Sequence, residues 1–214
     1  MSAASPHPSP RLRFPGVRPP RPLLGPETEG RLTGRQRELL AGLEKLLGVE
    51  RLADLPMARI AARLGCSLRT CYGIAPSKEE LILAVVDRRL HRIGRKAVEK
   101  LDASLPPLDA VRIYLRAVNE AVQPETASVS RDFAELPGAQ RLVDAHEDYV
   151  IAVTRSLLER AVSAGAIPPV DTASVAHVLG GLGRELSRPE VAAAASASPR
   201  DTANEVTEIL LRGL

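Results

Sequence analysis

The stretch that decides the fold is residues 57–73, which read MARIAARLGCSLRTCYG. Its apolar residues recur at spacings of three and four and predict a short helix with one apolar face; they are Met57, Ile60, Ala61 and Leu64. Gly65 then ends this helix, because glycine readily adopts the left-handed conformation of a C-terminal cap. Ser67 is a favourable N-cap for a second short helix through Tyr72.

Two short helices joined by a tight turn form a helix-turn-helix, in which the second helix enters the major groove of DNA. The joint at Gly65-Cys66 must be small because the two helices meet at a steep angle. The inner face is expected to consist of Ile60, Ala61, Leu64, Cys66 and Cys71. The outward and edge positions are expected to be Leu68, Arg69, Thr70, Tyr72 and Gly73. The two thiols fit small apolar core positions, and a redox switch is the alternative.

Helical periodicity continues on both sides of this unit, without the alternation that is typical of strands. Leucines at helical spacing predict a helix over 33–47. Ser77 followed by Lys78-Glu79-Glu80 has the pattern of a capping box and predicts a long helix ending near Asp102. Prolines and glycines then delimit further helices at about 108–122, 126–135, 139–165, 171–187 and 200–212. The sequence therefore predicts an all-α protein of about nine helices.

Residues 1–30 differ from the rest of the chain because they hold eight of its eighteen prolines and four arginines. This composition predicts a disordered, partly polyproline-like tail that is either passive or attracted to phosphate. We expect a three-helix DNA-binding domain with the helix-turn-helix at 31–76. We expect a helical regulatory domain, for ligand binding and dimerisation, at 77–214.

The charge of the chain is unevenly distributed. Residues 31–100 carry fifteen Lys or Arg against eight Asp or Glu, whereas residues 101–214 carry ten against sixteen. The excess of positive charge in residues 31–100 favours a polyanionic partner for that part of the chain. The alternative is that these charges belong to an ordinary solvated surface. No apolar run has the length of a membrane span, no secretory leader is evident, and two cysteines give no disulfide framework. We therefore expect a cytoplasmic protein that does not bind membranes.

From Arg35 to Val86 the chain resembles the DNA-binding domain of TetR-type transcriptional regulators. The matching elements are Ile60-Ala61, Gly65-Cys66-Ser67, Thr70-Cys71-Tyr72 and Ser77-Lys78-Glu79-Glu80-Leu81. The C-terminal half is similar to that family in architecture only. The resemblance implies a homodimeric repressor that binds double-stranded DNA at a near-palindromic operator and is released by a small, moderately hydrophobic effector. The alternative is a helical DNA-binding regulator without a small-molecule effector.

The resemblance also assigns roles to single residues. It implies that Ser67 and Thr70 cap the recognition helix or bind phosphate, and that Tyr72 and Lys78 contact the DNA backbone. The variable positions that face bases are Leu68, Arg69 and Gly73. The sequence departs from the family pattern at Pro56, which is usually Thr or Ser, at Ile74-Ala75, usually an aromatic pair, and at Arg69, often Gly.

For the C-terminal half the resemblance implies a ligand pocket among the middle helices. The candidate residues are Tyr114, Leu115, Val118, Phe133, His146, Tyr149, Val153 and Leu182, which can equally be ordinary core. It further implies a dimer interface of four helices, two from each subunit. Its apolar stripes are Val175, Val178, Leu179, Leu182 and Leu186, then Val206, Ile209, Leu210 and Leu211.

The remaining sequence features bear on metal binding, on catalysis and on one glycine-rich stretch. The four histidines show no metal-ligand spacing, so we expect no metal ion and no cofactor, and His146 is expected on a solvated or hydrogen-bonded helix face. The chain contains no nucleophile elbow and no phosphate loop, so we do not expect an enzyme. The glycines at 180, 181 and 183 either let another backbone approach a helix closely or break that helix.

Overall fold

The structure is a computed structural model that describes residues 10–47, 52, 55–121 and 136–214. Within these residues it contains helices and no strand, which confirms the all-α prediction. The head consists of α1 (Pro26–Arg31), α2 (Gly34–Leu47), α3 (Met57–Arg63) and α4 (Leu68–Tyr72). The body consists of α6 (Pro107–Val118), the 3₁₀ helix η2 (Asn119–Ala121), α8 (Ala139–Ser163), α9 (Thr172–Leu186), α10 (Pro189–Ala194) and α11 (Pro199–Gly213).

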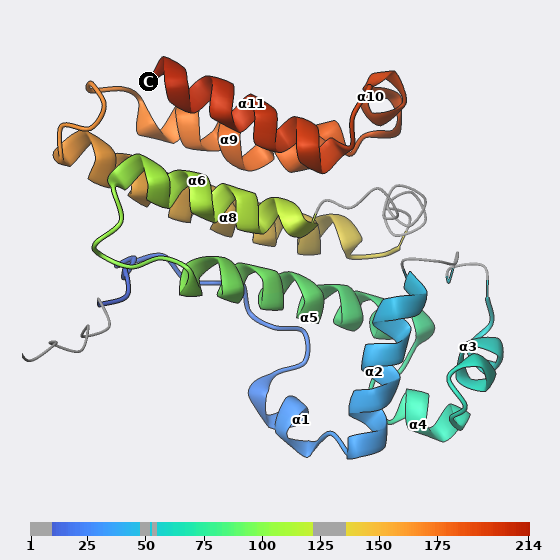
Figure 1. Ribbon diagram of the computed structural model, residues 1–214. Coiled ribbons are helices and arrows are strands. Elements are labelled where there is room, and N and C mark those ends of the chain that lie inside the picture. Colours follow the sequence, from blue (N-terminus) through green and yellow to red (C-terminus); the bar gives the residue numbers. More distant parts are fainter. Residues whose placement is uncertain (1–9, 48–51, 53–54, 122–135) are drawn as a thin grey trace, which may run out of the picture.

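The long helix α5 (Lys78–Glu99) connects the head to the body. Figure 1 shows α2, α3 and α4 below one end of α5 and α1 below its middle, while α6 and α8, and then α9 and α11, are stacked above it. No helix among the described residues is both long enough and apolar enough to cross a membrane.

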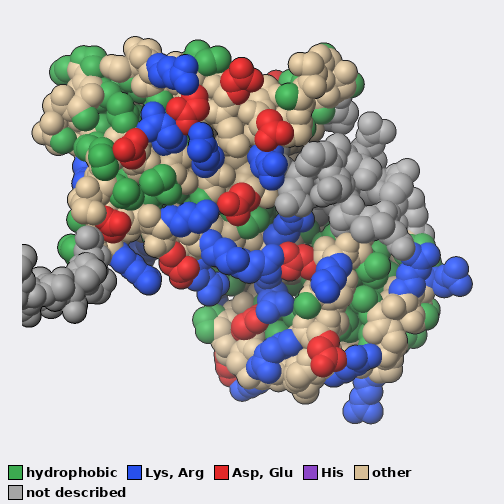
Figure 2. All heavy atoms as spheres, in the orientation of Figure 1, with side chains coloured by type: hydrophobic (Ala, Val, Ile, Leu, Met, Phe, Trp, Pro, Cys, Tyr) green, Lys and Arg blue, Asp and Glu red, His purple; other side chains and the backbone are tan. Residues whose placement is uncertain are grey.

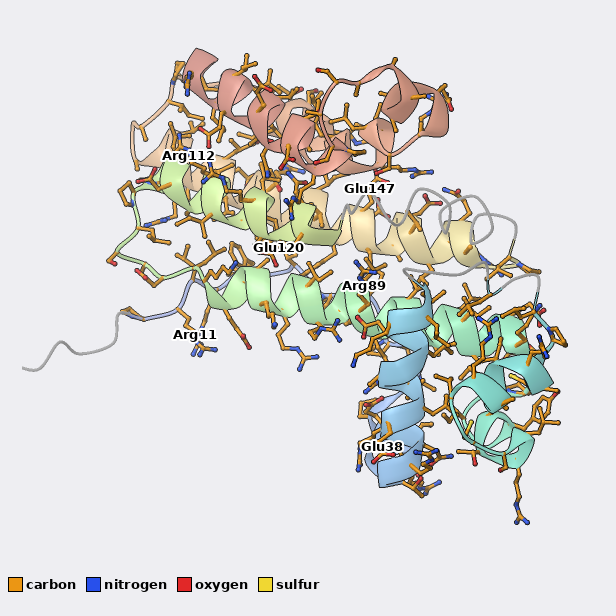
Figure 3. The ribbon with its side chains drawn as sticks, turned by 45° about the vertical axis from the view of Figure 1, so that its right-hand side comes forward. Arg11, Glu38, Arg89, Arg112, Glu120 and Glu147 are labelled. Atoms are coloured by element: carbon orange, nitrogen blue, oxygen red, sulfur yellow. The ribbon has the colours of Figure 1, made fainter. Side chains whose placement is uncertain are left out.

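The head has a hydrophobic core of its own, built from α2, α3, α4 and the first turns of α5. Its most buried members include Leu40, Leu43, Ile60, Cys71 and Leu81. Because Leu81 and its neighbours Ile82 and Val85 belong to this core, α5 is held by the head over its N-terminal half. In Figure 3, α2 crosses this part of α5 at a steep angle.

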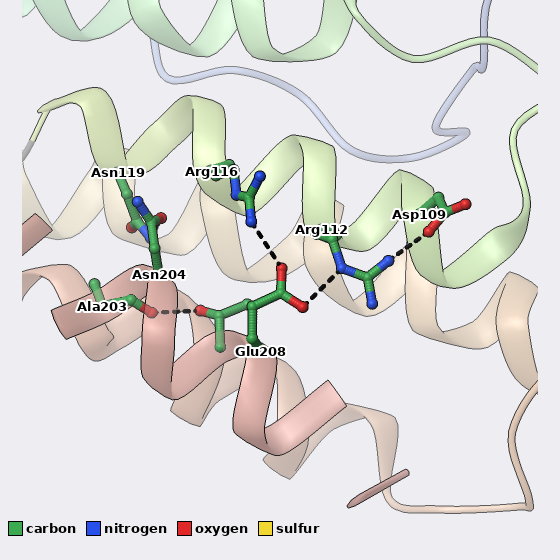
Figure 4. Close-up of polar contacts among 8 residues, drawn as sticks. Asp109, Arg112, Arg116, Asn119, Ala203, Asn204 and Glu208 are labelled. Atoms are coloured by element: carbon green, nitrogen blue, oxygen red, sulfur yellow. Dashed lines mark hydrogen bonds and ion pairs between the residues drawn. The ribbon is translucent and has the colours of Figure 1, made fainter. Parts of the chain in front are cut away.

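The body has a second core between α5, α6, α8, α9 and α11. Its fully buried side chains include Leu101, Tyr114, Val153, Leu157, Leu158 and Leu179. Polar contacts fix α11 against α6 (Figure 4): Arg112 Nε donates to Glu208 Oε2 over 2.9 Å, and Arg116 Nη2 donates to Glu208 Oε1 over 3.1 Å. Charge-assisted contacts of this kind are directional, so they align two helices that otherwise meet through apolar surfaces.

The segment predicted to be a disordered tail packs against the body from residue 10 onward. The amide of Leu12 donates to the carbonyl of Leu101, and the amide of Leu23 donates to Asp87 Oδ2 over 2.8 Å. Phe14 and Val17 lie against the body core. The prediction of disorder was therefore wrong for residues 10–30. A few apolar side chains and backbone amides are enough to order this segment, because they find partners on the surface of the body and on α5.

Two short helices, α1 and α10, are not predicted by the sequence pattern. Both begin with a proline at the first position, Pro26 or Pro189, where the missing amide is not needed. The prolines around 189–199 predict a linker when each is read as a helix breaker. That reading is wrong for Pro189, because a proline at the first position of a helix does not break it. The helix predicted at 126–135 lies outside the described residues.

The glycines near the end of α9 do not break the helix. A Cβ added to Gly180 would lie 2.7 Å from Ile151 Cγ1 and 3.4 Å from its Cα on α8. The close approach therefore occurs inside one chain, between α8 and α9.

We predict that Gly180→Ala destabilises the protein. The added methyl group overpacks Ile151, typically at about 1–3 kcal/mol, and the gain of about 1 kcal/mol in helix propensity offsets only part of it. The control is Gly30→Ala in α1, where a Cβ meets nothing within 4 Å. Denaturant titration at one fixed protein concentration measures both. A Gly180→Ala protein as stable as the wild type would contradict this close packing.

Candidate nucleic-acid interface

The turn between α3 and α4 is closed by glycine and by an arginine from α2. Gly65 has a φ of +59°, which favours glycine, and the amide of Cys66 donates to the carbonyl of Ala61 over 2.9 Å. Arg35 Nη2 donates to the carbonyl of Gly65 over 2.5 Å and so satisfies a carbonyl at the C-terminal end of α3. Sequence reasoning missed Arg35, because only the fold brings it to this turn.

Ser67 caps the second helix of the motif, as its sequence predicted. Its Oγ accepts a hydrogen bond from the amide of Thr70 over 3.1 Å and lies 2.9 Å from Thr70 Oγ1. Gln36 Nε2 donates to the carbonyl of Gly73 over 3.1 Å at the other end of α4. The five-residue helix α4 is therefore held at both ends, which gives its side chains a fixed direction.

The outer face of α4 presents large side chains to solvent. Leu68 is 42% exposed and Tyr72 is 52% exposed, and Arg69 is exposed beside them. The inner face buries Cys71 completely. Large exposed apolar or aromatic side chains on a rigid helix are typical of a contact surface.

Basic side chains are exposed on the helices of the head. Lys and Arg side chains project from the lower part of the molecule in Figure 2, where the head lies. Arg59 and Arg63 are exposed on α3, and Arg37 is exposed on α2. Lys78 opens α5 after its N-cap Ser77, with Nζ 3.9 Å from Glu79 Oε1. Exposed positive charge on the part of the molecule that carries α4 suits a polyanion.

The positions that depart from the TetR pattern differ in their surroundings. Pro56 stands at the N-cap of α3 and makes no side-chain cap. Ile74 and Ala75 are buried in the head core. Arg69 keeps its exposed position on α4.

The two cysteines lie together under α4, with their sulfur atoms 3.7 Å apart. Burial, followed by the hydrogen bond with Cys66, raises the pKa of Cys71 to about 12. A thiol with such a pKa stays protonated and unreactive near neutral pH. The complete burial and raised pKa of Cys71 therefore support the apolar-core interpretation for that thiol.

The residues predicted for a ligand pocket fall into four groups, of which His146 alone forms the last. Tyr114, Leu115 and Val153 are buried in the body core, and the half-buried residues packed against it are Val118, Tyr149 and Leu182. Phe133 lies outside the described residues. The phenol oxygen of Tyr114 is buried and has no hydrogen-bond partner among the described residues, and burial raises its pKa well above the ordinary value.

His146 lies away from that core, at the junction of α5 and α8. Its Nε2 is 2.9 Å from Asp87 Oδ1, and His91 Nε2 is 3.4 Å from the same oxygen. The pKa of His91 lies below its ordinary value, mainly because the ring is buried. The charge of Asp87 opposes this shift, whereas His146 and Arg95 add to it. Sequence reasoning missed this cluster, although the four-residue spacing from Asp87 to His91 places both on one helix face.

Comparison with known proteins finds the same fold in transcriptional regulators. No family model matches the sequence, and no curated protein matches it. The TetR-family regulator PfmR from Thermus thermophilus is 21% identical, with a TM-score of 0.60 over 82% of this chain and 98% of that one.

Two further neighbours were solved with ligands. AibR, in complex with isovaleryl coenzyme A and operator DNA, is 18% identical, with a TM-score of 0.59 over 82% of this chain and 97% of that one. FadR from Bacillus subtilis, in complex with stearoyl-CoA, is 12% identical, with a TM-score of 0.67 over 83% of this chain and 98% of that one. The head with its helix-turn-helix, the connecting α5 and the helical body therefore form a TetR-like fold.

Proposed function

We propose that this protein is a TetR-type transcriptional regulator that binds double-stranded DNA through α4. The observation that carries the proposal is the outer face of α4, where Leu68, Arg69 and Tyr72 are exposed while Cys71 is buried beneath them. A helix fixed at both ends can present these side chains to base edges and phosphates in a major groove. The experiment that tests it is selection of bound duplexes from a random DNA pool.

The individual DNA contacts are proposed from position and chemistry. Tyr72 at the end of α4 and Lys78 at the start of α5 carry donors, and Ser67 and Thr70 carry hydroxyls at the start of α4. Such groups fix the protein on phosphates without reading sequence. Arg69 has the reach and the paired donors to recognise guanine, and Leu68 and Gly73 complete the base-facing positions.

We propose that two chains bind one near-palindromic operator. A single helix-turn-helix covers only a short half-site, so a two-fold dimer is the usual arrangement. Three apolar side chains support an interface on the outer side of α9 and α11: Val178 is 53% exposed, Ile209 is 60% exposed, and Leu210 is also exposed. Leu179 and Leu211, predicted for the same stripes, belong instead to the body core.

We further propose that a small, moderately hydrophobic ligand releases the protein from its operator, as for a repressor. The buried phenol of Tyr114, without a hydrogen-bond partner among the described residues, supports a polar contact to a ligand in an otherwise apolar region. Helix α5 connects that region to Lys78, so a ligand that shifts α5 can change the spacing of the two recognition helices. Ligand action requires different affinities for the two arrangements.

A regulator without an effector is favoured by a different observation. Tyr114, Leu115 and Val153 are almost completely buried in one continuous core with Leu157 and Leu158. A core packed in this way can serve stability alone. The two candidates differ in whether any ligand changes the affinity for DNA.

For DNA binding, we predict that Tyr72→Ala combined with Lys78→Ala weakens binding to all duplexes alike, because both residues contact phosphate. Arg69→Ala should relax the preference at one base pair by about 1–3 kcal/mol. Fluorescence anisotropy with the selected duplex and its single-base variants measures both effects. Arg155→Ala on α8, which removes an equal charge far from the head, should leave binding unchanged. Full affinity of the double variant would exclude this docking.

For assembly, we predict that Val178→Arg or Ile209→Arg gives folded monomers with weakened operator binding, because each places a charge in an apolar interface. Analytical ultracentrifugation measures the oligomeric state, and circular dichroism verifies folding. Leu23→Arg is the matched control, since Leu23 is also an exposed apolar residue but lies on the N-terminal segment. A wild-type protein that sediments as a monomer at micromolar concentration would refute the dimer.

For the effector, we predict that an acyl-CoA raises the melting temperature and lowers the affinity for the operator. The first probes are isovaleryl-CoA and stearoyl-CoA, with which two structural neighbours were solved. Tyr114→Phe should weaken the response by about 0.5–1.5 kcal/mol, the value of one hydrogen bond. If these thioesters and a broad set of apolar metabolites leave both quantities unchanged, the regulator without an effector is the correct candidate.

A further inference from the structure

Three potential metal ligands meet between α5 and α8, outside the proposed DNA interface. Asp87 and His91 lie one turn apart on α5, and His146 comes from α8. One ligand atom from each residue lies within 4.8 Å of the other two. The Asp87 side chain is completely buried, and the side chains of His91 and His146 are 14% and 11% exposed. The three groups are therefore shielded from water, unlike a cluster of surface carboxylates.

The two distances to the Asp87 oxygen are close to those of a coordination sphere, and all three ligand atoms lie within 4.8 Å of one another. In a tetrahedral site with metal–ligand bonds of about 2.0–2.1 Å, adjacent ligand atoms lie roughly 3.3 Å apart. His91 Nε2 is 3.4 Å from Asp87 Oδ1, and His146 Nε2 is 2.9 Å from the same oxygen. The second separation needs to widen by only a few tenths of an ångström. Both rings already converge on one carboxylate oxygen, with centroids 4.7 Å apart in an edge-to-face arrangement.

The hydrogen bonding of the cluster is incomplete without a further group. His91 Nε2 is buried and has no hydrogen-bond partner among the described residues, although it lies 3.4 Å from Asp87 Oδ1. A buried ring nitrogen left in this state carries an energetic penalty, whether it bears a proton or a lone pair. A metal ion bound to the lone pair removes that penalty.

The carboxylate is oriented from outside the cluster. The amide of Leu23, on the segment that runs beside α5, donates to Asp87 Oδ2 over 2.8 Å. This contact leaves Oδ1 directed at the two imidazoles. Outer hydrogen bonds of this kind orient the ligands of metal sites and contribute to their affinity.

We propose that Asp87, His91 and His146 bind one divalent transition-metal ion that ties α5 to α8. Two imidazoles and one carboxylate suit Zn²⁺ or Fe²⁺ better than Mg²⁺ or Ca²⁺, which prefer all-oxygen sites. Three protein ligands leave a position for water or a small anion. The expectation of no metal site came from spacing along the sequence, and spacing does not detect a ligand contributed by a second helix.

Zn²⁺ is the probe for the test. Untagged full-length protein, freed of metal by a chelator, is titrated with Zn²⁺ by calorimetry and followed by thermal unfolding. We expect one ion per chain and a higher melting temperature with Zn²⁺, since an ion that binds only the folded state stabilises it. His91→Gln and His146→Gln should each weaken Zn²⁺ binding by more than about tenfold. Removing a residue that only hydrogen-bonds to a metal ligand can already cost that much, and these variants remove a ligand itself. His177→Gln, at an exposed histidine of α9, should bind as the wild type does.

A measurement on the wild-type protein keeps the test independent of variant folding. Side-chain ¹H–¹⁵N spectra should show the ring nitrogens of His91 and His146 becoming metal-bound on addition of Zn²⁺, while His177 is unchanged. The proposal is overturned if the wild type binds no Zn²⁺ at micromolar concentration. It is also overturned if only other histidines respond, or if folded His91→Gln and His146→Gln proteins retain the wild-type affinity.

Discussion

The burial of α5 at both of its ends is the constraint on which the rest of the structure depends. Leu81 and Val85 are held in the head core, while Ala97 and Leu101, just beyond its end, are held in the body core. Because one continuous helix joins two hydrophobic cores, the head cannot turn without moving α5 against α6 and α8. At about 1.5 Å per residue, the 22 residues of α5 extend from Lys78 in the head to the body core.

The contacts around the middle of α5 determine how far it can move. Asp87 receives the amide of Leu23 and contacts His146, while Arg88 pairs with Glu29 of α1. Arg92 pairs with Glu44 of α2 in the same region. These polar contacts are directional, whereas the apolar cores on either side permit small sliding movements. The middle of α5 is therefore held by polar contacts to the N-terminal segment, α1, α2 and α8.

The sequence was most informative where local rules act alone. Gly65, Ser67 and Ser77 specify helix ends through backbone conformation and capping, and the structure has those ends within one residue of the predicted positions. It was least informative where distant segments meet. The residues around Arg35 give no signal that its side chain closes the turn after α3. Likewise, Phe14 packs on a surface that exists only in the folded body. His91 and His146 are separated by more than fifty residues, so only the fold brings them to one carboxylate.

DNA reading by α4 is tested most directly by hydrogen exchange of the protein with and without a duplex obtained by selection. If α4 reads DNA and the N-terminus of α5 binds phosphate, bound DNA should slow amide exchange over residues 67–80. Amides of α9 and α11 should be unaffected at a protein concentration where the dimer is already formed. Protection confined to the body, with residues 67–80 exchanging as in the free protein, would contradict DNA binding through this face.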